Sequence, residues 1–251
     1  MYLLLIGGTA VVGVGSLVYR NLTLASSKKR KRSLIPTYTF FLKDKDIDNV
    51  NSVLSQLVSS HDDAFSKPTT FVQLVDAVPY DQVIHLVIHT NGGAAVAAEK
   101  MLRKLRAHPA GYIAYIKQSC YSAGTILALG ANEIVMTRDS MLGKIDPQIG
   151  NKQMSIHAAT PKDLISSDNV YDVHEGIYAM NYITELLDII FGKEKKTTLR
   201  ANIEKDMLHS PLPHYKAFTF EDCLGLGLPV RMANEQDLPL FEYDQQIVNY
   251  Q

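Results

Sequence analysis

The sequence contains no tryptophan, only two cysteines and no excess of charge of either sign. Cys120 and Cys223 are too few for a disulfide framework, and no cluster of cysteine and histidine has the spacing of a zinc site. The 25 basic and 26 acidic side chains give a formal net charge of −1, so charge gives no reason to expect a nucleic-acid partner. We therefore expect a reducing compartment, no metal, no other cofactor and no nucleic acid.

Long apolar runs are also rare, and the exception lies at the N-terminus. Residues 2–19 carry no charge and are mostly leucine, valine, isoleucine, glycine and alanine, and a basic run follows at 28–32. This is roughly the minimum apolar length that spans a bilayer. No basic residue precedes it, as one would in a cleaved signal peptide, so residues 1–20 are predicted to form a single-pass signal anchor. The positive-inside rule then places the chain after the anchor in the cytoplasm. The alternative is a loosely attached hydrophobic arm.

Beyond this N-terminal region, strand-like and helix-like segments alternate. The pattern predicts strands over Thr37–Leu42, Gln82–Ile88, Tyr112–Ile116 and Glu133–Met136, and helices over Asp46–Leu57, Ala94–Ala107, Ser122–Ala131 and Val170–Phe191. Such alternation is typical of an α/β protein with sites at the carboxyl ends of its strands. After Gly150 the pattern becomes helical, and Thr219 is a plausible N-cap.

Two turns at predicted strand ends carry residues suited to acyl transfer. At 90–93, paired glycines leave backbone N–H groups unhindered, so that one can face a ligand oxygen. At 118–124, Ser122 opens a helix and leaves the N–H of Ala123 free. Taken singly, the first is an ordinary tight turn and the second an ordinary serine N-cap. Together they supply a nucleophile and two oxyanion donors at one edge of the sheet.

The residues around these turns carry a family resemblance. The stretches that carry it are HTNGGAAVAAEKMLRKLRAH, CYSAGTILALGANEIVM, MLGKIDPQIG and, near the end, FEDCLGLGLPV. They resemble the serine dehydrogenase proteinase family, which comprises membrane-associated relatives of signal peptide peptidase A within the Clp protease/crotonase fold. The close resemblance covers about Leu86–Gly150, and a looser one extends from the anchor to Pro229.

The resemblance implies a fold, an activity and site residues. The fold is an α/β Clp protease/crotonase-like superhelix of strand-strand-helix units, here with an N-terminal transmembrane anchor and a helical C-terminal part. The implied divisions are an anchor at 1–20, a basic juxtamembrane linker at 21–36, a protease domain at 37–235 and a C-terminal tail at 236–251. The implied nucleophile is Ser122, the backbone N–H groups of Gly93 and Ala123 form the oxyanion hole, and a lysine replaces histidine as base. The family also implies a homo-oligomer.

Lys162 is the predicted base, because its separation from Ser122 in sequence is similar to that in related membrane serine proteases. Burial in an apolar site is what would leave such an amine neutral. The alternatives are Lys152, Lys144 and His157, although Lys144 stands where the family typically has proline. The position that matches the Clp histidine is occupied by Asp146. His214 falls where the family often has a histidine, with no mechanism assigned to it.

Three functions remain open. The first is a membrane-anchored serine endopeptidase that faces the cytoplasm, binds an extended peptide or protein at its sheet edge and cleaves it through an acyl-enzyme. The second is a crotonase-like enzyme acting on acyl-CoA, and the third is a catalytically inactive membrane-associated scaffold. Other residues are given structural roles: Cys120 as a small buried hydrophobe, His85 and His89 as pleat residues, and the apolar residues of 176–191 as core or oligomer face.

Overall fold

A computed structural model of the chain describes residues 36, 38–42, 47, 57–58, 70–149, 156–157, 170–193 and 197–242. The predicted anchor, nearly all of the predicted linker and the last residues of the predicted tail lie outside this set. Over the residues that the structure does describe, no helix is long and apolar enough to cross a membrane.

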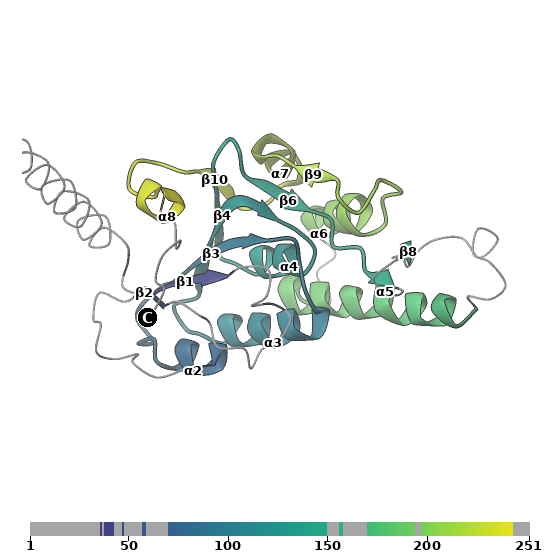
Figure 1. Cartoon of the computed structure of the whole chain (residues 1–251), viewed down its shortest axis with the longest axis horizontal. Coiled ribbons are helices and arrows are strands. Elements are labelled where there is room, and N and C mark those ends of the chain that lie inside the picture. Colours follow the sequence, from purple (N-terminus) through teal and green to yellow (C-terminus); the bar gives the residue numbers. More distant parts are fainter. Residues whose placement is uncertain are drawn as a thin grey trace, which may run out of the picture.

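The architecture is a twisted, mostly parallel sheet with its main helices on one face (Figure 1). Its strands are β1 (Thr39–Leu42), β2 (Leu57–Val58), β3 (Ile84–Thr90), β4 (Tyr112–Cys120), β5 (Glu133–Met136), β6 (Met141–Gly143), β9 (Ala217–Phe218) and β10 (Val230–Met232). The order is β10-β5-β4-β3-β1-β2, with β6 pairing with both β4 and β9. Only the β1–β2 and β6–β9 pairs are antiparallel among those strands. A separate antiparallel pair joins β7 (Gln148–Ile149) to β8 (Ile156–His157).

Helices provide the apolar surface that covers the sheet. They are α2 (Phe71–Asp76), α3 (Ala95–Arg106), α4 (Ala123–Leu129), α5 (Val170–Phe191), α6 (Thr198–Ile203), the π-helical turn η4 (Glu204–Leu208), α7 (Phe220–Leu226) and α8 (Leu238–Glu242). The main core lies between the sheet and α2, α3, α4 and α5. On the opposite face, Leu240 of α8 packs with Phe41, Val87, Tyr115 and Val135 in a smaller apolar cluster.

Most of the predicted elements are confirmed. The helix predicted over Val170–Phe191 has those bounds, and Thr219 caps α7 with a full capping box. One side of α5 is core, since Ile183, Leu186 and Leu187 are buried, whereas Ile177 is exposed.

Two details of the prediction are wrong, and a third is contradicted only at one end. The strand predicted over Tyr112–Ile116 continues to Cys120. A β-bulge in the pairing with β3 shifts the register, and the strand resumes pairing after it. The C-terminal part is not only helical, since β9 and β10 add strands to the main sheet. The helix predicted over Asp46–Leu57 lies almost entirely outside the described residues, and its last residue belongs to β2.

Candidate active site

Ser122 lies in a strained turn between β4 and α4. Its φ of 53° and ψ of −120° are unfavourable for a residue with a side chain, at a typical cost of about 1–3 kcal/mol. The hydroxyl makes no N-cap hydrogen bond to the helix that it precedes. The turn is held by the backbone, since the Ser122 N–H donates to the Lys144 carbonyl at 3.1 Å. Ser122 is therefore not an ordinary N-cap, and its backbone resembles the strained strand-to-helix turn that exposes nucleophilic serines.

The Gly-Gly turn after β3 lies directly against Ser122. A Cβ atom at Gly92, whose φ is +127°, would lie 2.8 Å from Ser122 Cβ and 3.3 Å from Oγ. A Cβ atom at Gly93 would lie 2.8 Å from Cβ of Ile47. The Thr90 hydroxyl accepts from the Gly92 N–H at 3.0 Å, and the Thr90 carbonyl accepts from the Tyr121 N–H at 3.0 Å. The two turns that the sequence singled out are thus brought together, and neither glycine has room for a side chain.

Two backbone N–H groups beside Ser122 have no hydrogen-bond partner among the described residues. They belong to Gly93 and Ala123. Gly93 is exposed, whereas Ala123 begins α4 and is buried. Unused N–H groups on both sides of a serine hydroxyl can bind an oxygen on which negative charge develops.

A β-bulge before the turn and hydrogen bonds of Thr125 hold the backbone around Ser122 in place. Gln118 has a φ of 68°, and the β3–β4 register shifts between Ile88 and Thr90, which marks a β-bulge just before the turn. The buried Thr125 hydroxyl donates to the Cys120 carbonyl at 2.8 Å and accepts from the Gly143 N–H at 3.3 Å. Burial raises the pKa of the Cys120 thiol, so Cys120 is a packed apolar residue, as predicted.

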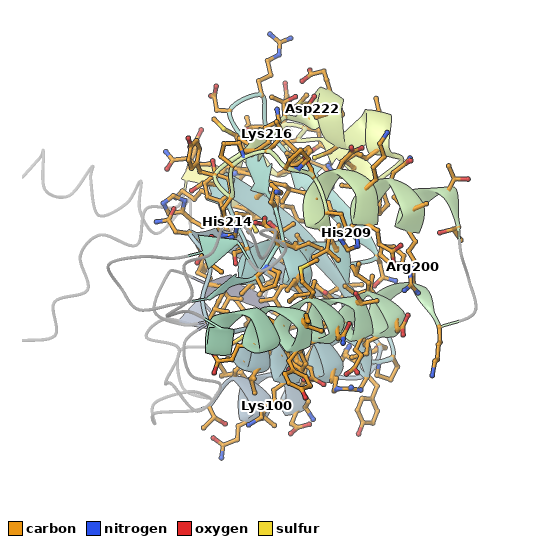
Figure 2. The ribbon with its side chains drawn as sticks, turned by 90° about the vertical axis from the view of Figure 1, so that its right-hand side faces the viewer. Lys100, Arg200, His209, His214, Lys216 and Asp222 are labelled. Carbon is orange, nitrogen blue, oxygen red and sulfur yellow. The ribbon has the colours of Figure 1, made fainter. Side chains whose placement is uncertain are left out.

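A buried polar cluster lies along the segment that bonds to the Ser122 backbone. Asp146 is fully buried, and its Oδ1 lies 3.0 Å from Nδ1 of His214 and 3.5 Å from Nζ of Lys144. Its Oδ2 accepts from Nε2 of Gln148 at 2.8 Å. His214 comes from the segment between η4 and β9 and is labelled in Figure 2 together with Lys216, which follows it. Its side chain is 29% exposed, so one edge of the ring reaches solvent.

Of the four residues predicted as possible bases, the structure describes the side chain of Lys144 only. Lys162 and Lys152 lie outside the described residues, as does the side chain of His157. Lys144 is described, and its buried Nζ donates to the carbonyls of Ser210 and Leu212 at 2.6 and 2.7 Å. Oδ1 of Asp146, at 3.5 Å, forms an ion pair with the same ammonium, so three oxygens surround Nζ.

Sequence reasoning missed the pairing of His214 with Asp146. The only signal was indirect: Asp146 occupies the position that matches the Clp histidine, and His214 matches a family histidine. The contact joins segments far apart in the chain, and no periodicity predicts it.

The two histidines of β3, His85 and His89, contact neighbouring side chains of the sheet. The His85 ring stacks on Tyr115, with centroids 5.6 Å apart, and its Nδ1 lies 2.9 Å from the Tyr115 hydroxyl. Ser119 Oγ lies 3.4 Å from Nδ1 of His89. Across the described part of the chain, no three His, Cys, Asp or Glu side chains are grouped so that they could hold a metal ion.

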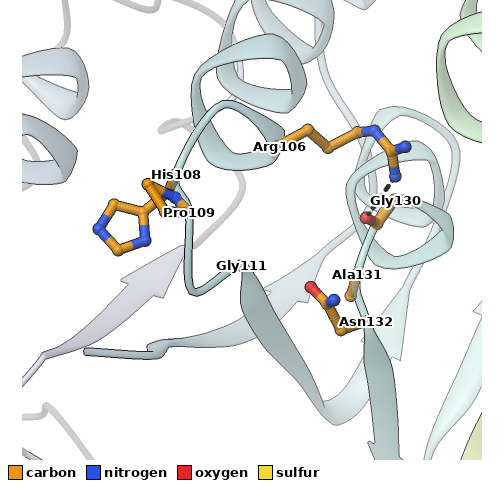
Figure 3. Close-up of a pocket in the computed structure, with 7 residues that line it drawn as sticks. All are labelled: Arg106, His108, Pro109, Gly111, Gly130, Ala131 and Asn132. Atoms are coloured by element: carbon orange, nitrogen blue, oxygen red, sulfur yellow. Dashed lines mark hydrogen bonds between the residues drawn. The ribbon is translucent and has the colours of Figure 1, made fainter. Parts of the chain in front are cut away.

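A pocket of about 260 Å³ lies at the opposite edge of the sheet (Figure 3). It is lined by Arg106, His108, Pro109, Gly111, Gly130, Ala131 and Asn132, which precede β4 and β5. Nη1 of Arg106 donates to the Gly130 carbonyl at 3.2 Å, and Oδ1 of Asn132 accepts from the Tyr112 N–H at 3.1 Å. Because Ser122 follows β4, this pocket is at the other end of the strand from the serine.

Comparison with known proteins gives the family. The model of the ClpP-like SDH-type serine proteinases matches residues 66–250. The chain belongs to this family. The resemblance seen in the sequence is thereby confirmed, and the mostly parallel α/β sheet is the ClpP-like fold of the family.

Curated relatives include two uncharacterized proteins of Methanocaldococcus jannaschii. One is 30% identical over 169 residues, which are 63% of this chain and 57% of that protein. The other is 38% identical over 79 residues, which are 32% of this chain and 27% of that protein. The chain therefore spans less than two thirds of the length of either relative.

Similar solved structures include two mutants of the 1510-N membrane-bound stomatin-specific protease. A serine-to-alanine mutant is 21% identical, with a TM-score of 0.47 and coverage of 67% of this chain and 73% of that one. A lysine-to-alanine mutant in complex with a substrate peptide is 20% identical, with a TM-score of 0.47 and coverage of 80% and 77%.

Proposed function

We propose that this protein is a serine peptidase that cleaves peptide bonds through an acyl-enzyme on Ser122. The observation that carries the proposal is the strained Ser122 turn, packed against Gly92 and close in the chain to the N–H groups of Gly93 and Ala123, which have no partner in the described part of the chain. A strained nucleophile with preorganised donors is what acyl transfer requires, and one such donor is typically worth about 10²–10³ in kcat.

Each step of the reaction has a group to carry it. Oγ of Ser122 gives its proton to a base and attacks the peptide carbonyl carbon, while the N–H groups of Gly93 and Ala123 stabilise the oxyanion. The C–N bond then breaks, and the base returns the proton to the leaving amine. A water activated by the same base hydrolyses the ester and frees Ser122.

For the base we propose His214, oriented by Asp146. The 3.0 Å contact from Nδ1 to the carboxylate assigns the Nδ1 hydrogen to that bond, which leaves Nε2 as the proton acceptor. The carboxylate also stabilises the imidazolium that forms as His214 takes the proton of the attacking serine. Lys162, the base expected from the sequence, is the rival, and a Ser122–Lys162 dyad is the outcome to be tested against it.

The test is hydrolysis of an unfolded protein by the full chain and four variants. Ser122→Ala is expected to abolish cleavage, and Ser119→Ala is its matched control. His214→Gln should lower kcat at least about a hundredfold, the usual worth of a general base. Lys162→Met should leave cleavage near the wild-type rate. Loss in Lys162→Met with cleavage retained in His214→Gln would instead assign the base to lysine. A folded wild type that cleaves nothing would favour the scaffold.

We also propose the setting expected from the sequence: a single-pass protein anchored by residues 1–20, with a cytoplasmic homo-oligomeric catalytic domain and peptide or protein substrates. The apolar run and the basic run that follows it support the anchor and its orientation. Alkaline carbonate extraction and protease protection of the full chain test this setting. Release of the chain by carbonate would contradict the anchor.

A further inference from the structure

We infer that Lys144 is a positioning residue, a buried cation that fastens the segment carrying His214 to the strained serine turn. This inference rests on the proposed function for its consequence in catalysis. Its structural half, the fastening of the segment, can be measured whether or not the protein is a peptidase.

Lys144 is unusual because a charged side chain is completely enclosed. Both Lys144 and Asp146 have 0% exposed side chains. Lysine is almost never fully buried unless it is paired and hydrogen-bonded, since burial removes the hydration of the charge. The protein compensates with two carbonyls and one carboxylate around Nζ, a surrounding that suits an ammonium.

The residue joins three parts of the site. Its backbone carbonyl accepts from the Ser122 N–H at 3.1 Å. Its ammonium binds the carbonyls of Ser210 and Leu212, which lie shortly before His214. The ammonium also lies 3.5 Å from Oδ1 of Asp146, the oxygen that contacts His214. The backbone of Lys144 therefore holds the nucleophile turn, and its side chain holds the carboxylate and the histidine segment.

The composition of the histidine segment explains why it needs such an attachment. Pro211 and Pro213 have no N–H to donate, and the Leu212 N–H is used within the segment on Oγ of Ser210 at 3.3 Å. Over residues 211–213, only carbonyl oxygens remain for binding to the rest of the protein. An ammonium donates up to three hydrogen bonds and accepts none, so it suits a short stretch that offers carbonyl oxygens.

The charge of Lys144 also acts on His214 through the shared carboxylate. Oδ1 of Asp146 lies 3.0 Å from Nδ1 of His214 and 3.5 Å from the Lys144 ammonium, so the positive charge of Lys144 opposes the formation of an imidazolium on the same oxygen. Without that charge, the carboxylate would hold the imidazolium of His214 more strongly. The acid limb of the pH–rate profile should then move to higher pH.

Lys144→Met in the full chain tests the inference, with the exposed Lys205→Met as the control that removes the same charge elsewhere. Hydrogen exchange of amides 209–216 should speed up about tenfold or more in Lys144→Met, while exchange in β3 and β4 stays unchanged. The kcat should fall about tenfold or more with little change in KM, and the acid limb should move up in pH. Lys205→Met should behave as wild type.

Unchanged exchange at 209–216 in folded Lys144→Met would overturn the inference. Faster exchange in a protein whose wild type hydrolyses nothing would refute the peptidase while supporting the attachment. If Lys144→Met does not fold, the rate of reductive methylation of each lysine in the wild type shows whether the Lys144 ammonium is enclosed. Lys144 should react far more slowly than Lys205, and equal rates would overturn the inference.

Discussion

At the scale of single residues, the site is defined by positions whose backbone conformation or close neighbours disfavour most side chains. Gly92 has a positive φ and faces Ser122, and Gly143 faces the Tyr121 ring at a distance that leaves no room for a Cβ atom. Ser122 itself occupies an unfavourable backbone conformation. Such strain is retained where the surrounding structure over-determines it, typically at functional sites.

Gly92→Ala should damage both stability and activity. The new methyl group would lie 2.8 Å from Ser122 Cβ at a φ of +127°, so we expect a loss of about 1–3 kcal/mol and a large fall in hydrolysis. Urea unfolding and hydrolysis measure the two effects. Gly225→Ala is the control, because a Cβ atom there meets nothing within 4 Å, and it should be neutral or slightly stabilising. Equal behaviour of the two variants would contradict the close contact at Ser122.

Ser122→Gly should stabilise the protein while it abolishes hydrolysis. Glycine adopts a φ of 53° with a ψ of −120° more easily than serine, which should return about 1 kcal/mol. Ser122→Ala keeps the Cβ atom and should therefore lose activity without this gain. Thermal unfolding of the two inactive variants separates the strain from the loss of the hydroxyl. A Gly variant no more stable than the Ala variant would show that the turn is not strained.

At the scale of elements, the bulge in β4 and the loop before β9 decide the geometry of the site. Hydrophobic periodicity predicted β4 only as far as Ile116, because the bulge at Gln118 interrupts the alternation of side chains. The sequence did indicate that both turns follow buried strands, so their meeting could be predicted from parallel pairing alone. It could not indicate that Lys144 is buried, since an isolated lysine is ordinarily exposed.

His85, on the sheet face that α8 covers, should make the folded protein less stable as the pH falls. Burial lowers the pKa of His85 on β3, and the negative charge of Asp237 partly opposes this shift. Below its unfolded pKa of about 6.5, the unfolded chain binds a proton at His85 more readily than the folded chain. The contribution of neutral His85 is therefore fully present above about pH 6.5 and declines as the pH falls towards the lowered folded value.

His85→Gln should flatten this decline. Denaturant unfolding between about pH 5 and 7 should show a shallower dependence of stability on pH than in the wild type. The exposed His209→Gln should keep the wild-type slope. The groups facing His85 are Tyr115, whose hydroxyl contacts Nδ1, and Asp237, and neither change alters them. An unchanged slope in His85→Gln would contradict the burial effect.

At the scale of the whole molecule, the family and the fold could be predicted from three short motifs around the two turns. The match of the family model over 66–250 confirms them. The division of the chain at 20, 36 and 235 remains a prediction. α8 belongs to the predicted tail, yet its Leu240 is buried against the sheet.

The sequence could not predict contacts between residues that are far apart in the chain. The contact between His214 and Asp146 depends on how the segment before β9 returns to the carboxyl edge of the sheet. Neither residue carries a local pattern that marks the other. The base predicted from its similarity in spacing to related membrane serine proteases, Lys162, competes with a histidine that only the three-dimensional arrangement places beside a carboxylate.

Covalent labelling shows directly whether Ser122 is the nucleophile. The full chain is treated with a fluorophosphonate, which reacts with activated serines, and the modified residue is identified by mass spectrometry. Ser122 should be labelled in the wild type and in Lys162→Met, and labelling should fall at least about a hundredfold in His214→Gln. Labelling of a different serine, or none in the folded wild type, would contradict the assignment of Ser122 as the nucleophile.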